Sequence, residues 1–502
     1  MRITTLTDLL RQGADAAAAL HAPGGRPLTY AALRALVART TASLRAHGVG
    51  RGDRVAIVLP NGPEMAASFV AVASAAAACP LNPAYRADEF EFYLSDLKAR
   101  ALVVEKGSSS PAVAVAQRLG VQVLELAAGE AGSGDFTLPG AGGLSDDDVT
   151  RPDDVALILH TSGTTSRPKI VPLTQANICA SAGNVARTLA LGAADRALNV
   201  MPLFHIHGLI AGLLAPLSVG STIYCSPGFN ALKFFAWMAE CKPTWYTAVP
   251  TMHQTILARA AQNKAVIDAN PLRFLRSSSS SIPPQVIAEL EAVFGAPLIE
   301  SYGMTEAAHQ MASNPLPPAV RKPGTVGRAA GPEVAIMDDA GALLPPGSTG
   351  EIVIRGPNVT AGYENNPKAN GEAFTNGWFR TGDQGSMDAE GYVSITGRLK
   401  EIINRGGEKV SPREVDEVLM DHVAVAQVVT FAMPHDKLGE DVAAVVVLRD
   451  GATATERELR EFLQARLADY KVPRKILFMD EIPKGATGKL QRIGLAQKLG
   501  LA

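Results

Sequence analysis

The chain is organised around one polar stretch, His160-Thr161-Ser162-Gly163-Thr164-Thr165-Ser166-Arg167-Pro168-Lys169. It follows the apolar run at residues 155–159, so a buried strand is predicted to lead into a polar loop. Gly163 lets the backbone come close to a ligand, the hydroxyl residues supply donors, and Lys169 adds a positive charge. Such a loop suits phosphate; on these residues alone, a polar surface turn is the alternative.

The stretch differs from the P-loop of nucleotide triphosphatases, which requires G-x-x-x-x-G-K-[ST] running straight into a helix. Lys169 is instead followed by the β-like run Ile170, Val171 and Pro172. A helix is predicted to begin only after Thr174, which serves as its N-cap. The common P-loop is therefore excluded.

The composition indicates a globular protein with a large core. With 502 residues, 47% of them hydrophobic, the chain is expected to form at least two domains. A formal net charge of -2 argues against a nucleic-acid binder with a general basic surface. The four cysteines lie far apart and show no zinc or disulfide spacing, so a cytoplasmic location is expected. The N-terminus lacks the apolar core of a signal peptide, and the alanine-rich run at residues 65–80 is shorter than the roughly 20 residues of a membrane span.

The first 150 residues alternate between helical and strand-like patterns. Helices are predicted at residues 30–44 and 64–78, and strands at 54–59 and 101–104. Strands that alternate with helices indicate a mainly parallel sheet that is covered on both faces. The fold class is therefore α/β.

The rest of the chain suggests further subdivisions. A second α/β segment follows the polar stretch, and residues 353–392 carry the glycines and short strands of a β-rich subdomain. In the last hundred residues, Thr455 and Glu458 form the capping box of an amphipathic helix. We place the domain boundary near residues 398–400, which gives domains at 1–397 and 398–502.

Several other stretches carry chemically useful side chains. Residues 301–306 (SYGMTE) combine a ring that could stack on a base, a hydroxyl for phosphate and a carboxylate for magnesium. Asp383 follows a turn and could accept hydrogen bonds from both ribose hydroxyls. Residues 397–401 lie at the predicted boundary, and residues 483–489 place Lys489 on a glycine-flanked loop.

Together these motifs resemble the adenylate-forming superfamily of acyl-CoA synthetases, firefly-luciferase-like enzymes and non-ribosomal-peptide adenylation domains. The resemblance covers nearly all 502 residues. Four further stretches are most similar to the oxalate–CoA ligase branch, close to the 4-coumarate–CoA ligases: residues 201–208, 245–251, 276–281 and 404–412.

The resemblance implies a large N-terminal domain of α/β subdomains plus a β-rich subdomain, followed by a small mobile α+β C-terminal domain. It also implies a two-step reaction that uses ATP, Mg²⁺ and coenzyme A. A carboxylate first attacks the α-phosphate to give an acyl-adenylate, and the CoA thiol then displaces AMP. The small domain would rotate about Lys400 between the steps, so that Lys489 serves the first and the Gly406-Gly407 face serves the second.

Individual roles follow from the same resemblance. The β- and γ-phosphates would be held by Thr161, Ser162, Gly163, Thr164, Thr165 and Lys169. The remaining nucleotide-binding residues would be Glu300, Ser301, Tyr302 (stacked on adenine), Gly303, Met304, Thr305 (on the α-phosphate), Asp383, Arg398 and Lys489. Glu306 would bind Mg²⁺, and His207 would shape the acid site and the thiol path.

The chain departs from the superfamily at two positions in this region. Ser166 and Ile170 stand where glycines are usual, although Ser166 is familiar in the oxalate branch. Ile170 removes a flexible position, so we expect it to slow closure of the loop without abolishing activity.

The acid site is expected to be small and polar. His207, Ser279, Ser280 and His309 could bind the second carboxylate of a small dicarboxylate, which favours oxalate. The serine run could instead be a tight turn and His309 a core histidine, and for Arg276 an edge-strand or surface position is favoured over a role as substrate ligand.

Other functions stay open on the sequence alone. The alternatives are a malonate, 4-coumarate-like or medium-chain acyl-CoA ligase, an adenylation domain that feeds a carrier protein, and a nucleotide-binding protein that has lost catalysis. Lys489 also resembles a site that is acetylated in related ligases, so a lysine acetyltransferase is a candidate partner. A monomer or homodimer is expected.

Overall fold

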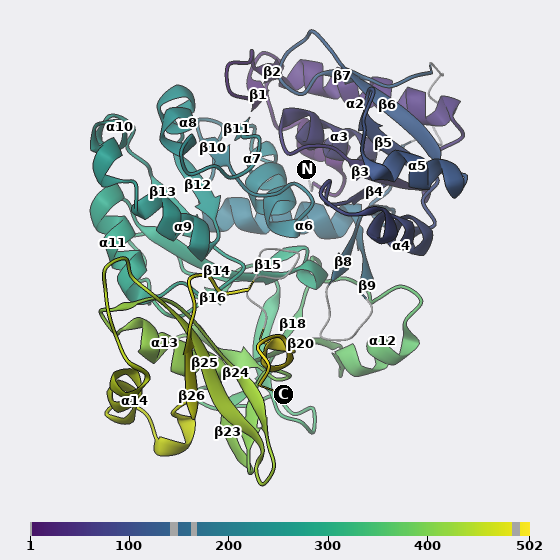
Figure 1. The fold of residues 1–502 in the computed structure, drawn as a ribbon. Coiled ribbons are helices and arrows are strands. Elements are labelled where there is room, and N and C mark those ends of the chain that lie inside the picture. The colour runs from purple at the N-terminus through teal and green to yellow at the C-terminus, as the bar shows by residue number, and fades with distance from the viewer. Residues whose placement is uncertain (1–2, 141–148, 162–167, 484–491, 502) are drawn as a thin grey trace. The chain divides into compact units, whose positions relative to one another are not determined.

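The chain folds into two compact units. The computed structural model describes residues 3–140, 149–161, 168–483 and 492–501 (Figure 1). The first unit comprises Met1–Val334 and Ile354–Phe379, and the second comprises Ala335–Val353 and Arg380–Ala502. Five residues with predicted nucleotide contacts lie outside the described residues: Ser162, Gly163, Thr164, Thr165 and Lys489.

A seven-stranded sheet forms one half of the first unit, in the order β7-β6-β5-β3-β4-β8-β9. Its strands are β3 (Arg54–Val58), β4 (Ala77–Pro80), β5 (Ala101–Glu105), β6 (Gln122–Ala128), β7 (Phe136–Thr137), β8 (Val155–Thr161) and β9 (Lys169–Thr174). Its helices include α2 (Tyr30–Ala46), α3 (Pro63–Ala73), α4 (Ala87–Leu97) and α5 (Pro111–Arg118). Strands β6, β5, β3, β4 and β8 run parallel, as predicted.

The helix predicted at residues 64–78 is wrong in its last part. Helix α3 ends at Ala73, and Ala77–Pro80 form strand β4, which lies between β3 and β8 with all four residues buried. A continuous run of small apolar residues has no period that separates a buried helix from a buried strand. The end of α3 and the start of β4 therefore could not be predicted from the apolar pattern.

A nine-stranded sheet forms the other half of the first unit, in the order β16-β15-β14-β13-β12-β10-β11-β1-β2. Its strands are β1 (Ala18–His21), β2 (Leu28–Thr29), β10 (Arg196–Asn199), β11 (Thr222–Cys225), β12 (Trp245–Ala248), β13 (Phe274–Ser277), β14 (Leu298–Met304), β15 (His309–Ser313) and β16 (Arg328–Ala329). The strands from β1 to β14 in the middle of this order are parallel, whereas β15 and β16 are antiparallel.

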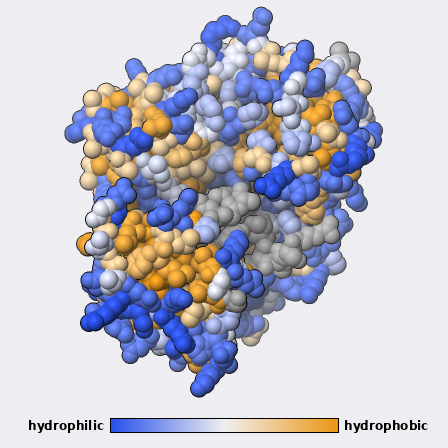
Figure 2. All heavy atoms as spheres, viewed as in Figure 1, coloured by the Kyte–Doolittle hydropathy of each residue, from blue (hydrophilic) through white to orange (hydrophobic). Residues whose placement is uncertain are grey.

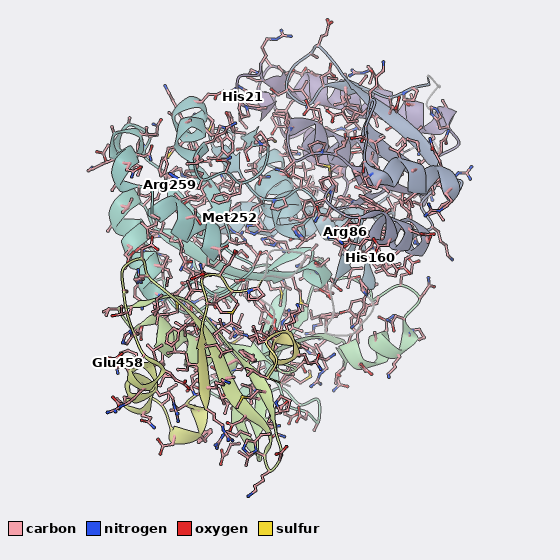
Figure 3. The ribbon with its side chains drawn as sticks, viewed as in Figure 1. His21, Arg86, His160, Met252, Arg259 and Glu458 are labelled. Carbon is pink, nitrogen blue, oxygen red and sulfur yellow. The ribbon has the colours of Figure 1, made fainter. Side chains whose placement is uncertain are left out.

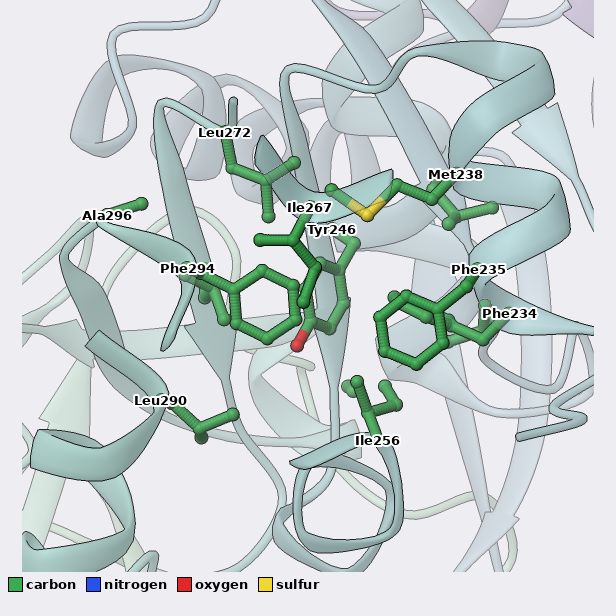
Figure 4. Packing of buried hydrophobic residues seen from close by; sticks show 14 of the residues in the cluster. Phe234, Phe235, Met238, Tyr246, Ile256, Ile267, Leu272, Leu290, Phe294 and Ala296 are labelled. Carbon is green, nitrogen blue, oxygen red and sulfur yellow. The ribbon is translucent and has the colours of Figure 1, made fainter. Parts of the chain in front are cut away.

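Helices cover both faces of this second sheet. One face packs on α8 (Phe234–Cys241), α9 (Pro250–Leu257), α10 (Lys264–Ala269) and α11 (Pro284–Phe294) through the apolar cluster in Figure 4. The other face packs on α6 (Gln175–Thr188), the π-helix η2 (His207–Leu214) and α7 (Ala215–Leu217). In β13, Leu275 belongs to the first face and Phe274 to the second. Because side chains alternate along a strand, Arg276 lies on the same face as Phe274.

Thr174 caps helix α6 as predicted. Its hydroxyl accepts a hydrogen bond from the backbone N–H of Asn177 (3.2 Å), and Asn177 Oδ1 in turn accepts one from the backbone N–H of Thr174 (2.9 Å). Two otherwise unsatisfied groups at the helix end are thereby paired.

Two further sheets contribute strands to the second unit. The first contains β17 (Glu333–Met337), β18 (Thr349–Arg355), β20 (Trp378–Met387) and β21 (Val393–Arg398), and the boundary between the units cuts through β17, β18 and β20. The second has the order β23-β22-β25-β24, with β26 on β25. Its elements are β22 (Ile403–Arg405), β23 (Glu408–Val410), β24 (Val425–His435), β25 (Gly439–Leu448), β26 (Lys475–Phe478), α13 (Pro412–Met420), α14 (Glu456–Gln464) and α15 (Leu495–Lys498). The capping box of Thr455 and Glu458 is confirmed at the start of α14; Figure 3 labels Glu458 there.

On the face that Figure 2 shows, hydrophilic side chains surround several apolar patches. None of the described helices has the length and hydropathy that a membrane crossing requires. All four cysteines are buried and unpaired. Burial raises the pKa of the Cys79 thiol to about 12, so that thiol stays protonated at neutral pH.

The buried His253 of α9 supplies a pH-dependent part of the stability. Tyr246 donates to its Nδ1 (3.1 Å), and its Nε2 donates to the Arg276 carbonyl (3.1 Å). Burial lowers the pKa of His253 to about 4, from 6.5. Between these values the unfolded chain binds the proton and the folded chain does not.

We therefore predict that stability falls as the pH drops from about 6.5 to 4. Above pH 6.5 His253 is neutral in both the folded and the unfolded chain. Below that pH only the unfolded chain takes up the proton, which lowers the free energy of unfolding by up to roughly 3 kcal/mol at pH 4. The thermal midpoint of wild type and of His253→Gln should be measured across this window. The variant is expected to show the shallower decline, and parallel curves would contradict the assignment.

Candidate active site

The described ends of the predicted phosphate stretch belong to the paired strands β8 and β9. Strand β8 ends at Thr161, which is paired with Lys169 at the start of β9. The two predicted phosphate ligands at the base of the loop are therefore held opposite each other. The Lys169 ammonium also lies 4.2 Å from the centre of the Tyr363 ring, an arrangement that stabilises a cation.

His160 anchors the same hairpin to helix α4. Its Nε2 lies 3.1 Å from the Asp96 carboxylate, and its ring meets the edge of Tyr93 at 4.8 Å between centroids (Figure 3 shows His160). Burial lowers the pKa of His160. These contacts fix the strand from which the phosphate stretch emerges.

Ile170 is a core residue of strand β9. It is 6% exposed, is paired with His160 and packs in the cluster that contains Ile158 and Phe90. Its carbonyl accepts a hydrogen bond from the backbone of Glu364 (3.1 Å). Replacement by glycine would leave a cavity in this core, so that change tests packing and not closure of the loop.

Strand β14 carries most of the second nucleotide motif. The Glu300 carboxylate is buried and accepts hydrogen bonds from the Asn314 amide (3.3 Å) and the Gly324 backbone (3.2 Å). Ser301 donates to the Ser277 carbonyl on β13 (3.2 Å). These polar groups therefore also hold neighbouring segments together. Their nucleotide contacts, and those of the adjacent Tyr302, Gly303, Met304 and Thr305, stay predictions.

Gly303 is required by close packing. A Cβ at this position would lie 1.8 Å from the His309 carbonyl oxygen on β15. A real Cβ cannot approach backbone so closely, so any other residue would force the two strands apart. The glycine thus lets β15 bring His309 beside the nucleotide motif.

Glu306 fits the predicted magnesium site. It is 5% exposed in the short helix η4 (Thr305–Ala307), and its Oε1 accepts a hydrogen bond from the Tyr363 hydroxyl (2.8 Å). Mg²⁺ is usually held by one or two carboxylates together with substrate phosphates. Tyr363 links Glu306 to Lys169, although nothing in its sequence position had singled it out.

Three of the four predicted acid-binding residues meet in one cluster. The His207 and His309 rings stack with centroids 4.9 Å apart at 16°, and His207 Nδ1 lies 3.1 Å from the Ser279 hydroxyl. His207 begins a π-helix, a rare element that is frequent at functional sites. Ser279 (φ +74°) and His309 (φ +97°) are both in the left-handed region, which is strained for such residues. Ser280 is exposed.

The expectation that Arg276 is an edge-strand or surface residue is wrong. It is 0% exposed and lies on β13, between β12 and β14 in the middle of the sheet. One terminal nitrogen faces His207 Nε2 (3.3 Å) and the Thr247 hydroxyl (3.4 Å); the other faces His309 Nε2 (3.0 Å) and Gln310 Oε1 (3.3 Å). Burial lowers the pKa of Arg276 to about 9, so the guanidinium remains charged at neutral pH.

The sequence did contain a signal for this burial. Arg276 follows Phe274 and Leu275 in a short run between two other apolar strands, a pattern typical of a strand buried on both faces. The nearby Arg273 suggested an exposed charged pair. In the structure Arg273 binds the Asp195 carboxylate (2.5 Å), so the exposure of Arg273 does not indicate where Arg276 lies.

The second unit brings together the two predicted ribose ligands. Arg398 Nε donates to Asp383 Oδ1 (3.0 Å) across the β20–β21 pair. Lys400, the predicted hinge, is exposed between β21 and β22. Gly406 (φ +61°) and Gly407 (φ +103°) form the two-residue turn between β22 and β23, where both central residues need positive φ.

An arginine near Lys489 was missed by the sequence reasoning. Arg492 donates to the Asp416 carboxylate on α13 (2.7 Å) and to the Thr430 carbonyl (2.7 Å), and it pairs with Glu401 (3.3 Å). Arg492, the first described residue of the last segment, is therefore bound both to α13 and to Glu401, the neighbour of Lys400.

Comparison with known proteins identifies the family. The family model described as AMP-binding enzyme matches residues 9–364, and that of the AMP-binding enzyme C-terminal domain matches residues 414–489. The chain belongs to the AMP-binding enzyme family. An oxalate–CoA ligase of Arabidopsis thaliana is 46% identical over 489 residues, which cover 95% of each chain.

Two further matches support the same family. An oxalate–CoA ligase of Saccharomyces cerevisiae is 43% identical over 485 residues, covering 89% of this chain and 87% of the yeast protein. Among solved structures, ATP-bound MatB from Rhodopseudomonas palustris has a TM-score of 0.90 and 30% identity, and the match covers 99% of both chains. The predicted α/β adenylate-forming fold and the acid–CoA ligase class are confirmed.

We predict that Tyr363→Phe weakens the use of MgATP. The variant keeps the ring beside Lys169 but removes the hydrogen bond to the Glu306 carboxylate, so kcat/KM for MgATP should fall about 10-fold. Initial rates at varied MgATP and at varied acid should be compared with those of Tyr470→Phe in the second unit. An equal change in the KM of both substrates would contradict a role confined to the metal and phosphate side.

Proposed function

We propose that the protein is an AMP-forming ligase that joins oxalate to coenzyme A. The observation that carries the proposal is the polar cluster of the buried His207 and His309 with the half-buried Ser279, in a chain that is 46% identical to an oxalate–CoA ligase over 95% of both lengths. Fatty and aromatic acids need a long apolar pocket. A small dicarboxylate instead needs donors for the carboxylate that does not react.

In the first step, an oxygen of the reacting carboxylate attacks the α-phosphorus of ATP and pyrophosphate leaves. Thr161 and Lys169 would hold the β- and γ-phosphates, with Thr305 on the α-phosphate and Lys489 bridging the reacting oxygens. These donors stabilise the charge that develops as the bond to pyrophosphate breaks. Glu306 would hold Mg²⁺, which neutralises phosphate charge when bound.

In the second step, the CoA sulfur attacks the acyl carbon and AMP leaves. The thiol needs the space that Lys489 fills in the first step, so one mobile domain with two working faces would serve both. We assign this domain to residues 398–502, with Lys400 as the hinge and Gly406-Gly407 on the CoA face. Asp383 and Arg398 would hold the ribose.

We also propose a cytoplasmic location, a monomer or homodimer, and acetylation of Lys489 as a means of regulation. Loss of its charge would remove the first-step function that we assign to this lysine.

A panel of acids tests the substrate. Oxalate, malonate, succinate, acetate, 4-coumarate and octanoate should be offered with ATP and CoA, with pyrophosphate release and the mass of the thioester as readouts. We expect the highest kcat/KM with oxalate. Absence of oxalyl-CoA would sink the proposed substrate, and absence of ATP–pyrophosphate exchange with every acid would indicate a non-catalytic nucleotide-binding protein.

The two half-reactions test the role of Lys489. We predict that Lys489→Ala lowers the rate of adenylate formation at least about 100-fold, because one donor to the transition-state charge is lost. The same variant should still transfer a supplied acyl-adenylate to CoA. Lys498→Ala, in the C-terminal helix α15, is the matched control, and equal loss of both half-reactions would contradict the two-face arrangement.

A further inference from the structure

The guanidinium of Arg276 contacts the Nε2 atoms of both histidines of the acid cluster, His207 and His309. It is fully buried, and among the described residues no carboxylate pairs with it. Its Nε has no hydrogen-bond partner in the described part of the chain. Charged groups are almost never buried without a carboxylate, so this position requires an explanation beyond packing.

The contacts fix the direction of each hydrogen bond. Arginine has only donors, so His207 Nε2 (3.3 Å) and His309 Nε2 (3.0 Å) must both accept. An accepting imidazole nitrogen carries no proton, which places the proton of each neutral ring on Nδ1. Thr247 is compatible with the same assignment: its hydroxyl oxygen accepts from Arg276 (3.4 Å), and with His207 Nε2 unprotonated its hydroxyl hydrogen is given to that nitrogen, 2.7 Å away.

The amide of Gln310 is oriented by the same rule. Its Nε2 donates to the Thr188 hydroxyl (3.1 Å) and the Ala330 carbonyl (3.0 Å), which leaves Oε1 to accept from Arg276 (3.3 Å). The groups around the guanidinium are therefore all acceptors toward it. A rearrangement in which one of them donates to Arg276 is chemically excluded.

We propose that Arg276 is a positioning residue that fixes the protons of His207 and His309 on Nδ1, so that the acid subsite presents hydrogen-bond donors and selects an anionic group. The proposal rests on the proposed function, because it concerns the same acid subsite. It names a residue that acts through the histidines, and no contact between Arg276 and substrate is required.

The chain of donors ends at Ser279. With the proton on Nδ1, His207 donates to the Ser279 oxygen (3.1 Å), and the hydroxyl hydrogen of Ser279 is then directed to another acceptor. A carboxylate accepts without donating, so it matches this polarity, whereas a group with only donors does not. The buried positive charge of Arg276 adds to the attraction.

The tautomers can be observed directly by long-range ¹H–¹⁵N correlation spectra of the full-length enzyme labelled with ¹⁵N-histidine. The chain has nine histidines, and signals are assigned with His207→Gln, His309→Gln and His253→Gln. At pH 7.5 without substrate we expect Nδ1–H for His207 and His309. His253 is the internal reference with Nε2–H, because it donates to the Arg276 carbonyl through that nitrogen. Nε2–H or a doubly protonated ring at His207 or His309 would overturn the proposal.

Kinetics then test the consequence. In Arg276→Met the KM for oxalate should rise about 10- to 100-fold, with the KM for ATP changed less than about twofold, and Arg276→Lys should recover part of the loss. Leu275→Ala is the control, since Leu275 is equally buried on the opposite face of β13. It should lower the thermal midpoint without moving the tautomers or the KM for oxalate.

The outcomes separate this inference from the proposed substrate. If the acid panel identifies another acid, the tautomers of the substrate-free enzyme are unaffected and the KM test is repeated with that acid. If oxalate is turned over but Arg276→Met changes the KM values of oxalate and ATP alike, the positioning role fails while the proposed function stands.

Discussion

The candidate site depends on the parallel register of three neighbouring strands. In that register Thr247 of β12 lies beside Arg276 of β13, and Ser277 lies beside Glu300 of β14. Because all three strands run in the same direction, their carboxyl ends meet at one edge, where open α/β sheets bind ligands. The acid cluster and the nucleotide motif are therefore neighbours as a consequence of strand pairing, although 53 residues separate Thr247 from Glu300.

A buried cation within this edge has an energetic cost that shapes its surroundings. Moving an ion out of water costs several kcal/mol even after relaxation, and neutral acceptors offset only part of it. Around Arg276 two imidazoles, a hydroxyl and an amide accept hydrogen bonds, but none of these carries a negative charge. An anion bound nearby would complete the compensation, which links the stability of the cluster to the charge of its ligand.

The sequence predicted the elements with strong periodicity or caps, but it did not predict how side chains from distant elements combine. Thr174 and Thr455 mark helix starts because their side chains pair with groups only three residues away. The strand at Ala77–Pro80 was missed because a run of alanine has no distinguishing period. Arg276 was misplaced because the nearby Arg273 suggested an exposed pair, whereas its apolar neighbours indicated a strand buried between two others. Tyr363 was missed because its partner Glu306 is 57 residues away.

Backbone strain at the same edge is consistent with a site whose geometry is set before the ligand arrives. Ser279 and His309 have positive φ, and Gly303 permits an approach to His309 that no other residue allows. Strained conformations persist only where surrounding contacts hold them, and here those contacts are the guanidinium, the stacked imidazole and the β14–β15 pairing. A donor array that is rigid in the free enzyme loses little entropy when an anion binds. For an acid as small as oxalate, which offers few contacts, this preorganisation is the means by which a polar cluster can bind it selectively.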